Sequence, residues 1–106
     1  MNDSLKPILA ELKQRLTELY GDRLSQLILF GSQARGDATE DSDVDVLVVL
    51  EGEVEPYAES DRVVPITADI SLRLGVVICC MYISRAQHEA RKSATLRNAS
   101  REGVRL

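Results

Sequence analysis

The chain has little of three things on which many functional sites depend: cysteine, histidine and long apolar runs. Its 106 residues contain two cysteines and one histidine, too few for the usual zinc sites. Cys79 and Cys80 are adjacent, so on a strand they would point to opposite faces and make poor disulfide partners. We interpret both as small core residues, and the lone His88 as a surface residue rather than a catalytic one.

The shortage of long apolar segments excludes a membrane role. No stretch approaches the roughly twenty apolar residues that cross a bilayer, and the charged, amphipathic N-terminus does not resemble a signal peptide. We therefore expect a cytoplasmic protein. The net charge of −4 argues against broad nucleic-acid binding, although the C-terminal quarter is basic and residues 37–61 are rich in acids. That asymmetry fits a charged partner or polyanion, and it equally fits solvated helix faces.

Length and composition predict a single domain over residues 1–106. A chain of this size can bury one modest core and lies below the size at which chains divide into domains. Its content of 44% hydrophobic and 28% charged residues is ordinary for a soluble globular protein. Nothing in the sequence repeats, and no tract is of low complexity.

Apolar runs at residues 27–30, 46–50 and 76–83 predict three buried strands. Their lengths and their bounding polar residues are typical of strands that are covered on both faces. Together with the helices between them, they give the order helix, strand, strand, helix, strand, helix. This order predicts an α/β (α+β) fold, in which helices pack on a small mixed β-sheet.

Most of the remaining chain is predicted to be helical. Apolar residues recur at helical spacing over residues 5–19, which predicts an amphipathic first helix. A second helical region covers 57–74, where Pro65 predicts a kink or a division into two short helices. Ser84 is placed to cap a third helix, and a final short helix is predicted over 94–102.

The stretch Gly31-Ser32-Gln33-Ala34-Arg35-Gly36 follows the first predicted strand and can form a phosphate cradle. A sharp exit from the strand favours Gly31, which has no Cβ. Ser32 can cap a short helix, whose free N–H groups and positive end attract phosphate. Arg35 lies one turn further on and can add a positive charge. We therefore predict nucleotide-binding roles for Gly31, Ser32 and Arg35.

Asp43 and Asp45 precede the second predicted strand and are candidate metal ligands. Residues at alternate positions of a strand share a face, so the two carboxylates should point the same way while Val44 points to the core. Two like charges on one face repel each other, and a magnesium ion with hard oxygen ligands would compensate them. Asp43 and Asp45 are thus the predicted metal-binding and catalytic residues.

Each half of this pattern is common by itself. A Gly-Ser pair occurs in many loops, and an Asp-x-Asp sequence before a strand can be a solvated turn. What favours a site is their linkage, because the Gly-Ser closes one strand and the Asp-x-Asp opens the next, ten residues later. If the two strands lie side by side, the phosphate cradle and the metal ligands meet at one end of the sheet.

The combination of Gly31-Ser32, a ten-residue spacing and Asp43-x-Asp45 resembles the nucleotidyltransferase superfamily that includes DNA polymerase beta. The fuller form resembles its minimal, stand-alone prokaryotic branch, whose members are often paired with a HEPN-domain protein in toxin–antitoxin systems. The match covers roughly residues 27–50. The resemblance implies the polymerase beta-like core and a Mg²⁺-dependent transfer of a nucleoside monophosphate. It also implies AMP from ATP as the group transferred, and a hydroxyl on a HEPN partner as the acceptor.

One feature departs from that family's pattern. Active relatives usually carry a third carboxylate on the strand after the Asp-x-Asp strand, yet residues 76–83 contain no Asp or Glu. The nearest acids are Asp69 before this strand and Glu89 after it. A two-metal mechanism needs ligands for both ions, so the sequence leaves two hypotheses open. The chain is either a working nucleotidyltransferase, which we favour, or a binding module of the same fold that neutralises a partner protein.

So small a chain is expected to rely on a partner to complete its substrate site. Exposed apolar surface on the first helix, or near residues 104–106, would in addition indicate a homo-oligomer.

Overall fold

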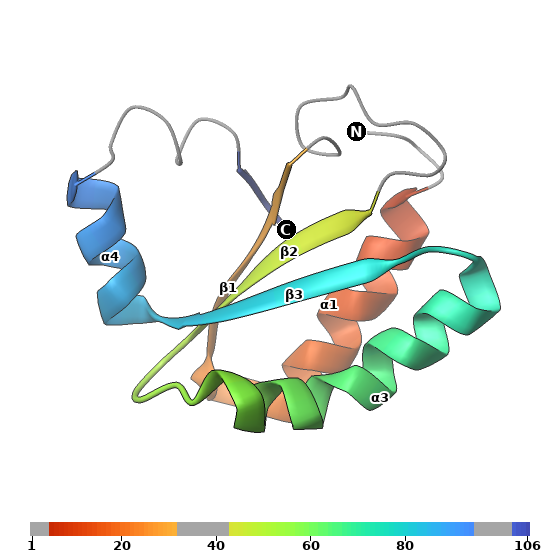
Figure 1. Cartoon of the computed structure of the whole chain (residues 1–106), viewed down its shortest axis with the longest axis horizontal. Coiled ribbons are helices and arrows are strands. Elements are labelled where there is room, and N and C mark those ends of the chain that lie inside the picture. Colours follow the sequence, from red (N-terminus) through yellow and green to blue (C-terminus); the bar gives the residue numbers. More distant parts are fainter. Residues whose placement is uncertain (1–4, 32–42, 95–102) are drawn as a thin grey trace.

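The computed structural model describes residues 5–31, 43–94 and 103–106, and the elements follow the expected order with an added C-terminal strand (Figure 1). The helices are α1 (Lys6–Tyr20), α3 (Pro56–Leu74) and α4 (Arg85–Ala94), with the short 3-10 helix η2 (Gly21–Arg23) after α1. The strands are β1 (Leu24–Phe30), β2 (Val44–Leu50), β3 (Ile78–Ser84) and β4 (Val104–Arg105).

The four strands form one mixed sheet in the order β3-β2-β1-β4. β1 is antiparallel to both β2 and β4, and β2 is parallel to β3. The prediction of a small mixed sheet with helices packed on it is therefore confirmed. Because β1 and β2 are direct neighbours, the end of β1 and the start of β2 meet at the same edge, as the spacing of the two motifs predicts.

The core lies between one face of this sheet and the pair of helices α1 and α3. The apolar stripe of α1 supplies Leu12 and Leu16, which are fully buried, and α3 supplies Val63 and Ile70. Alternate residues of β1 and β2 point to these helices. The predicted amphipathic first helix is thus confirmed. Among the described helices, none combines the length and the apolar content needed to cross a membrane.

The prediction that the strands are covered on both faces is wrong for β1 and β3. In β1, Leu27 and Leu29 are buried while Ile28 and Phe30 remain partly accessible, because the second face of the sheet is less fully covered. β3 forms an edge of the sheet, and its Cys79 and Met81 are exposed. The interpretation of both cysteines as core residues is therefore correct for Cys80, which packs against the core, and wrong for Cys79.

α3 runs through Pro65 as one continuous helix, so the prediction of two short helices is wrong. Packing of its buried residues on α1 and the sheet maintains the helix on both sides of the proline. The helix ends at Gly75, which adopts a left-handed conformation (φ 69°) and donates its N–H to the carbonyl of Ser71.

α4 begins with a reciprocal capping arrangement. The Gln87 N–H donates to Ser84 Oγ, and the Ser84 N–H donates to Gln87 Oε1, each at 3.1 Å. This confirms Ser84 as the cap. His88, expected at the surface, is buried, because α4 packs over β2 and β3 on the face of the sheet opposite α1 and α3. Val49 points to that second face and is likewise buried.

The C-terminal end of the chain differs from its prediction. The helix predicted over 94–102 lies outside the described residues, apart from Ala94, which ends α4. Strand β4 was not predicted, because two residues carry no recognisable alternation. It is held to β1 by ladder pairing and by the Leu106 N–H, which donates to the carbonyl of Leu27 at 2.8 Å.

Candidate active site

The end of β1 and the start of β2 bring Gly31 and Asp45 into contact. Phe30 pairs with Asp45 across the two strands, and Gly31 is the next residue along the chain. Gly31 has a φ of 74°, a conformation that side chains other than glycine rarely adopt. A Cβ on Gly31 would lie only 2.7 Å from Oδ2 of Asp45. Two properties of this position therefore favour glycine, the positive φ and the close approach of the Asp45 carboxylate.

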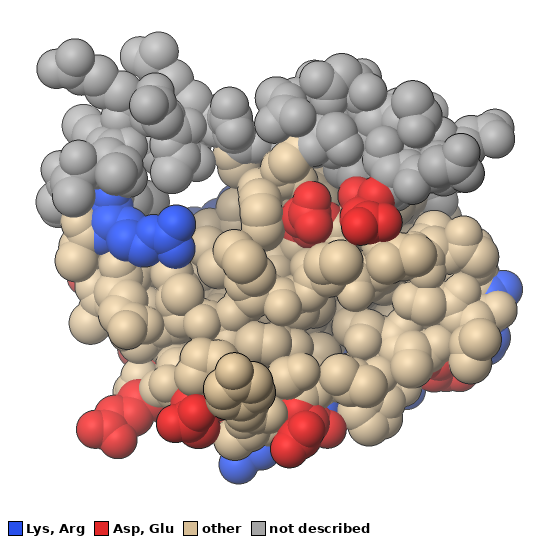
Figure 2. All heavy atoms as spheres, in the orientation of Figure 1, with Lys and Arg blue, Asp and Glu red and all other residues tan. Residues whose placement is uncertain are grey.

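Asp43 and Asp45 point to the same side of β2, as predicted. Val44, between them, is 1% exposed and faces the core, whereas Asp43 is exposed and Asp45 is half-buried. Figure 2 shows acidic side chains gathered over the start of β2 on the face in view. The other predicted site residues, Ser32 and Arg35, lie outside the described residues.

β3 brings a thiol to the two aspartates. Cys79 pairs with Asp45 in the parallel register of β2 and β3. Its thiol donates a long hydrogen bond to Asp43, with 3.9 Å between Sγ and Oδ2. Partial burial raises the pKa of the Cys79 thiol, and the negative charges of Asp43 and Asp45 raise it further. The sequence interpretation missed this residue, because an apolar run was read as a strand covered on both faces.

Asp69, the nearest acid before β3, has a structural role. It lies on α3, where it pairs with Arg15 of α1 at 2.6 Å and with Arg73 of its own helix at 3.2 Å. Hydrogen bonds from Arg73 and then Arg15 lower the pKa of the Asp69 carboxyl. These contacts join α1 to α3 on the helical side of the sheet, away from Asp43. Asp69 therefore does not complete the aspartate pair.

The donor set at this edge fits a magnesium ion carried by a nucleotide. Mg²⁺ in phosphate-transfer sites is commonly held by one or two carboxylates, with substrate phosphates and water supplying the remaining oxygens. Asp43 and Asp45 provide two carboxylates on one accessible face, and the lack of a Cβ on Gly31 lets the Asp45 carboxylate lie against the backbone that follows β1. No group of three or more His, Cys, Asp or Glu side chains in residues 5–31, 43–94 and 103–106 is placed to hold a metal by itself.

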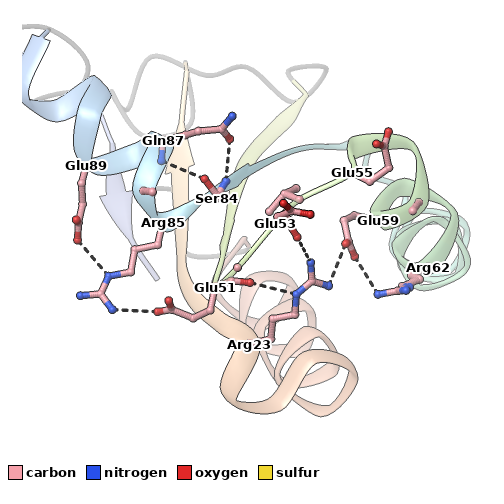
Figure 3. Close-up of a pocket in the computed structure, with 14 residues that line it drawn as sticks. Arg23, Glu51, Glu53, Glu55, Glu59, Arg62, Ser84, Arg85, Gln87 and Glu89 are labelled. Atoms are coloured by element: carbon pink, nitrogen blue, oxygen red, sulfur yellow. Dashed lines mark hydrogen bonds and ion pairs between the residues drawn. The ribbon is translucent and has the colours of Figure 1, made fainter.

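A hollow of about 970 Å³ lies at the opposite end of β2, roughly 20 Å from the aspartates at the usual rise of a strand (Figure 3). Its central acid is Glu59, which is almost fully buried. The Glu59 carboxylate forms ion pairs with Arg23 at 3.0 Å and with Arg62 at 3.4 Å. It also accepts a hydrogen bond from the Tyr20 hydroxyl at 2.9 Å. On the other wall, Arg85 pairs with two further acids.

The arginines around this hollow are thus each paired with an acid of the protein. Arg23 also donates to the carbonyls of Glu51 and Glu53, at 3.2 and 2.6 Å, and thereby holds the loop between β2 and α3. This network stabilises the fold, and it engages with acidic groups of the protein all three arginines that line the hollow, Arg23, Arg62 and Arg85, which are the groups that could attract phosphate. We therefore place the candidate active site at the Asp43–Asp45 edge and not at this hollow.

Comparison with known proteins agrees with this assignment. A model of the nucleotidyltransferase domain matches residues 9–99. The chain is 38% identical over 71 residues to a "Putative protein adenylyltransferase" of Methanocaldococcus jannaschii. The aligned residues cover 67% of this chain and 71% of the relative. The chain is 39% identical over 66 residues to the "Protein adenylyltransferase MntA" of Thermococcus cleftensis, which covers 55% of this chain and 65% of that protein.

A solved structure shares the fold. It is described as a toxin–antitoxin with AMP-PNP, and it superimposes with a TM-score of 0.58 at 15% sequence identity, over 89% of this chain and 68% of that one. At this identity the likeness concerns the fold alone. The family match spans most of the chain, including every described strand except β4. The predicted enzyme class is therefore confirmed, and the chain belongs to the nucleotidyltransferase domain family.

Proposed function

We propose that this protein transfers AMP from ATP to a hydroxyl group on a partner protein, with Mg²⁺ as the metal. The observation that carries the proposal is the meeting of Gly31, Asp43 and Asp45 at one sheet edge, where a carboxylate pair lies beside a glycine of positive φ. The names of the relatives, protein adenylyltransferases, support AMP as the group and protein as the acceptor.

In the proposed reaction the chain mainly binds and orients. The backbone at Gly31, the hydroxyl of Ser32 and the guanidinium of Arg35 hold the triphosphate, so that its α-phosphorus faces the acceptor. The acceptor hydroxyl releases its proton to solvent, its oxygen forms a bond to that phosphorus, the bond to the β-phosphate oxygen breaks, and pyrophosphate leaves. Asp43 and Asp45 would hold Mg²⁺, which when bound neutralises charge on the phosphates.

The partner that we propose is a HEPN-domain protein, which makes the role antitoxin-like. The neighbouring fold described as a toxin–antitoxin with an ATP analogue supports this choice, as does the MntA-type relative. We also propose that residues 1–106 act as one domain, and that the partner supplies the part of the acceptor site that the chain lacks.

A second candidate function rests on Cys79. Since a thiol occupies the position on β3 beside Asp45, the chain could act as a catalytically weak module that binds and neutralises its partner. The two functions differ in one observable property, the covalent transfer of AMP.

The test uses ATP labelled in its α-phosphate, Mg²⁺ and a purified HEPN-domain protein, with γ-labelled ATP in a parallel reaction. We expect the label to appear on the partner, and the rate to fall by about a hundredfold or more in Asp45→Asn, because metal sites supply several kcal/mol to such transfers. Asp61→Asn removes an exposed acid of α3 and is the matched control, which should transfer at the normal rate.

Each other result has a distinct meaning. Label from the γ-phosphate instead of the α-phosphate would identify a kinase and contradict the proposal. A stable complex with the partner but no transfer of either label would establish the binding module. Normal transfer by Asp45→Asn would remove this carboxylate from the site.

A further inference from the structure

The two strands beside β2 determine which side chains can join the aspartates. On the β1 side, Asp45 is paired with Phe30, which has no metal-binding atom. On the β3 side, Asp45 is paired with Cys79, and Val77, two residues before Cys79, accepts the Val44 N–H through its carbonyl at 2.8 Å. Of these neighbours, only Cys79 carries a side-chain donor atom, and it lies 3.9 Å from the Asp43 carboxylate.

The chemistry of that donor does not suit a second magnesium ion. Mg²⁺ takes hard oxygen ligands, whereas sulfur binds soft metals. Sites with two metal ions hold them roughly 3.5–4 Å apart, so ligands must reach both ions. Asp43 and Asp45 supply two carboxylates, and neither residue that is paired with Asp45 adds a third. A carboxylate in place of Cys79 would add both the charge and the oxygens that a second ion needs.

We propose that Cys79 limits the site to a single divalent metal ion, the one held by Asp43 and Asp45. This inference rests on the proposed function, because it takes the aspartates as metal ligands. It makes Cys79 the residue that sets the number of metal ions, and it predicts that Cys79→Asp creates a second metal site. The acceptor hydroxyl is then deprotonated without the help of a second ion.

The experiment counts Mn²⁺ ions by electron paramagnetic resonance, with a non-hydrolysable ATP analogue present. We expect about one bound ion per chain in the wild type and about two in Cys79→Asp. Cys79→Ser removes the sulfur without adding charge and should keep one ion. Met81→Asp is the matched control for added charge, because Met81 is exposed on the same face of β3 but is paired with Leu47, two residues beyond Asp45.

The outcomes separate this inference from the proposed function. Two ions in the wild type, or one ion in a folded Cys79→Asp variant, would overturn the inference and leave the proposed function in place. Two ions in Met81→Asp would also overturn it, since position 79 would then not be special. A wild type that binds no Mn²⁺ would overturn both. If circular dichroism finds Cys79→Asp unfolded, the number of Mn²⁺ ions bound by the wild type still tests the inference, because two ions there would overturn it.

Discussion

At the scale of single residues, the candidate site depends on a glycine as much as on its acids. Gly31 combines a positive φ with a close approach to Asp45, so a side chain there would both strain the backbone and displace the carboxylate. Gly75 has a similar φ, 69°, but no atom lies within 4 Å of a Cβ built on it. Substitutions at these two glycines can therefore distinguish the cost of a strained backbone from the cost of a collision with a neighbouring side chain.

We predict that Gly75→Ala loses about 1–2 kcal/mol of stability, the cost of a left-handed non-glycine residue, and that Gly31→Ala loses at least as much, because its Cβ would also meet Asp45. Only Gly31→Ala should also weaken Mn²⁺ binding, by about tenfold to a hundredfold, as expected when a metal ligand is disoriented. Urea denaturation and Mn²⁺ titration measure the two effects. Equal Mn²⁺ affinity in the two variants would mean that the contact with Asp45 has no role in the site.

At the scale of elements, a buried ion network joins α1, α3 and the loop after β2. Glu59 has a side chain that is 3% exposed, and it binds Arg23, Arg62 and the Tyr20 hydroxyl. Burial raises the pKa of Tyr20, and its hydrogen bond to Glu59 raises it further, so this hydroxyl stays a donor at neutral pH. The network therefore holds the end of β2 that is distant from the aspartates.

Removing the buried acid should destabilise the protein. We predict that Glu59→Ala lowers the free energy of unfolding by about 2–3 kcal/mol, at the lower end for buried pairs because Arg23 and Arg62 keep access to water. Glu53→Ala is the control in the same loop, since Glu53 is exposed and holds Arg23 through its backbone carbonyl. It should change stability by less than about 0.5 kcal/mol. Equal urea midpoints for both variants would contradict a stabilising role of the network.

At the scale of the whole molecule, the last residues of the chain complete the sheet. β4 covers the edge of β1, and Val104 and Leu106 pack against the core formed by the helices. An uncovered strand edge presents unpaired backbone groups, which favour association between chains. The contact between residues far apart in the sequence therefore protects the strand that leads into Gly31.

Deletion of residues 104–106 is predicted to lower the free energy of unfolding by roughly 2–4 kcal/mol, through lost ladder hydrogen bonds and apolar burial. It should also promote self-association, which size-exclusion chromatography with light scattering would detect. Arg105→Ala keeps the backbone of β4 and loses only an exposed side chain, so it should behave as the wild type. An unchanged urea midpoint together with a monomeric deletion variant would contradict this role of β4.

Local patterns determined much of the fold. The apolar spacing in α1, the run that becomes β2, and the cap at Ser84 depend on interactions within a few residues, so the sequence alone predicted them. The alternation of Asp43, Val44 and Asp45 likewise follows from the geometry of any strand. These features required no knowledge of what lies across the sheet.

Only the tertiary structure decided what surrounds the aspartates. Cys79 reaches Asp43 because β3 is a parallel neighbour of β2 in one register, and a single sequence does not contain that register. The burial of His88 depends in the same way on where α4 packs, and the continuity of α3 through Pro65 depends on tertiary contacts. The sequence alone thus determined which residues can bind a nucleotide and a metal. The long-range packing of strands and helices decided which other side chains stand beside them.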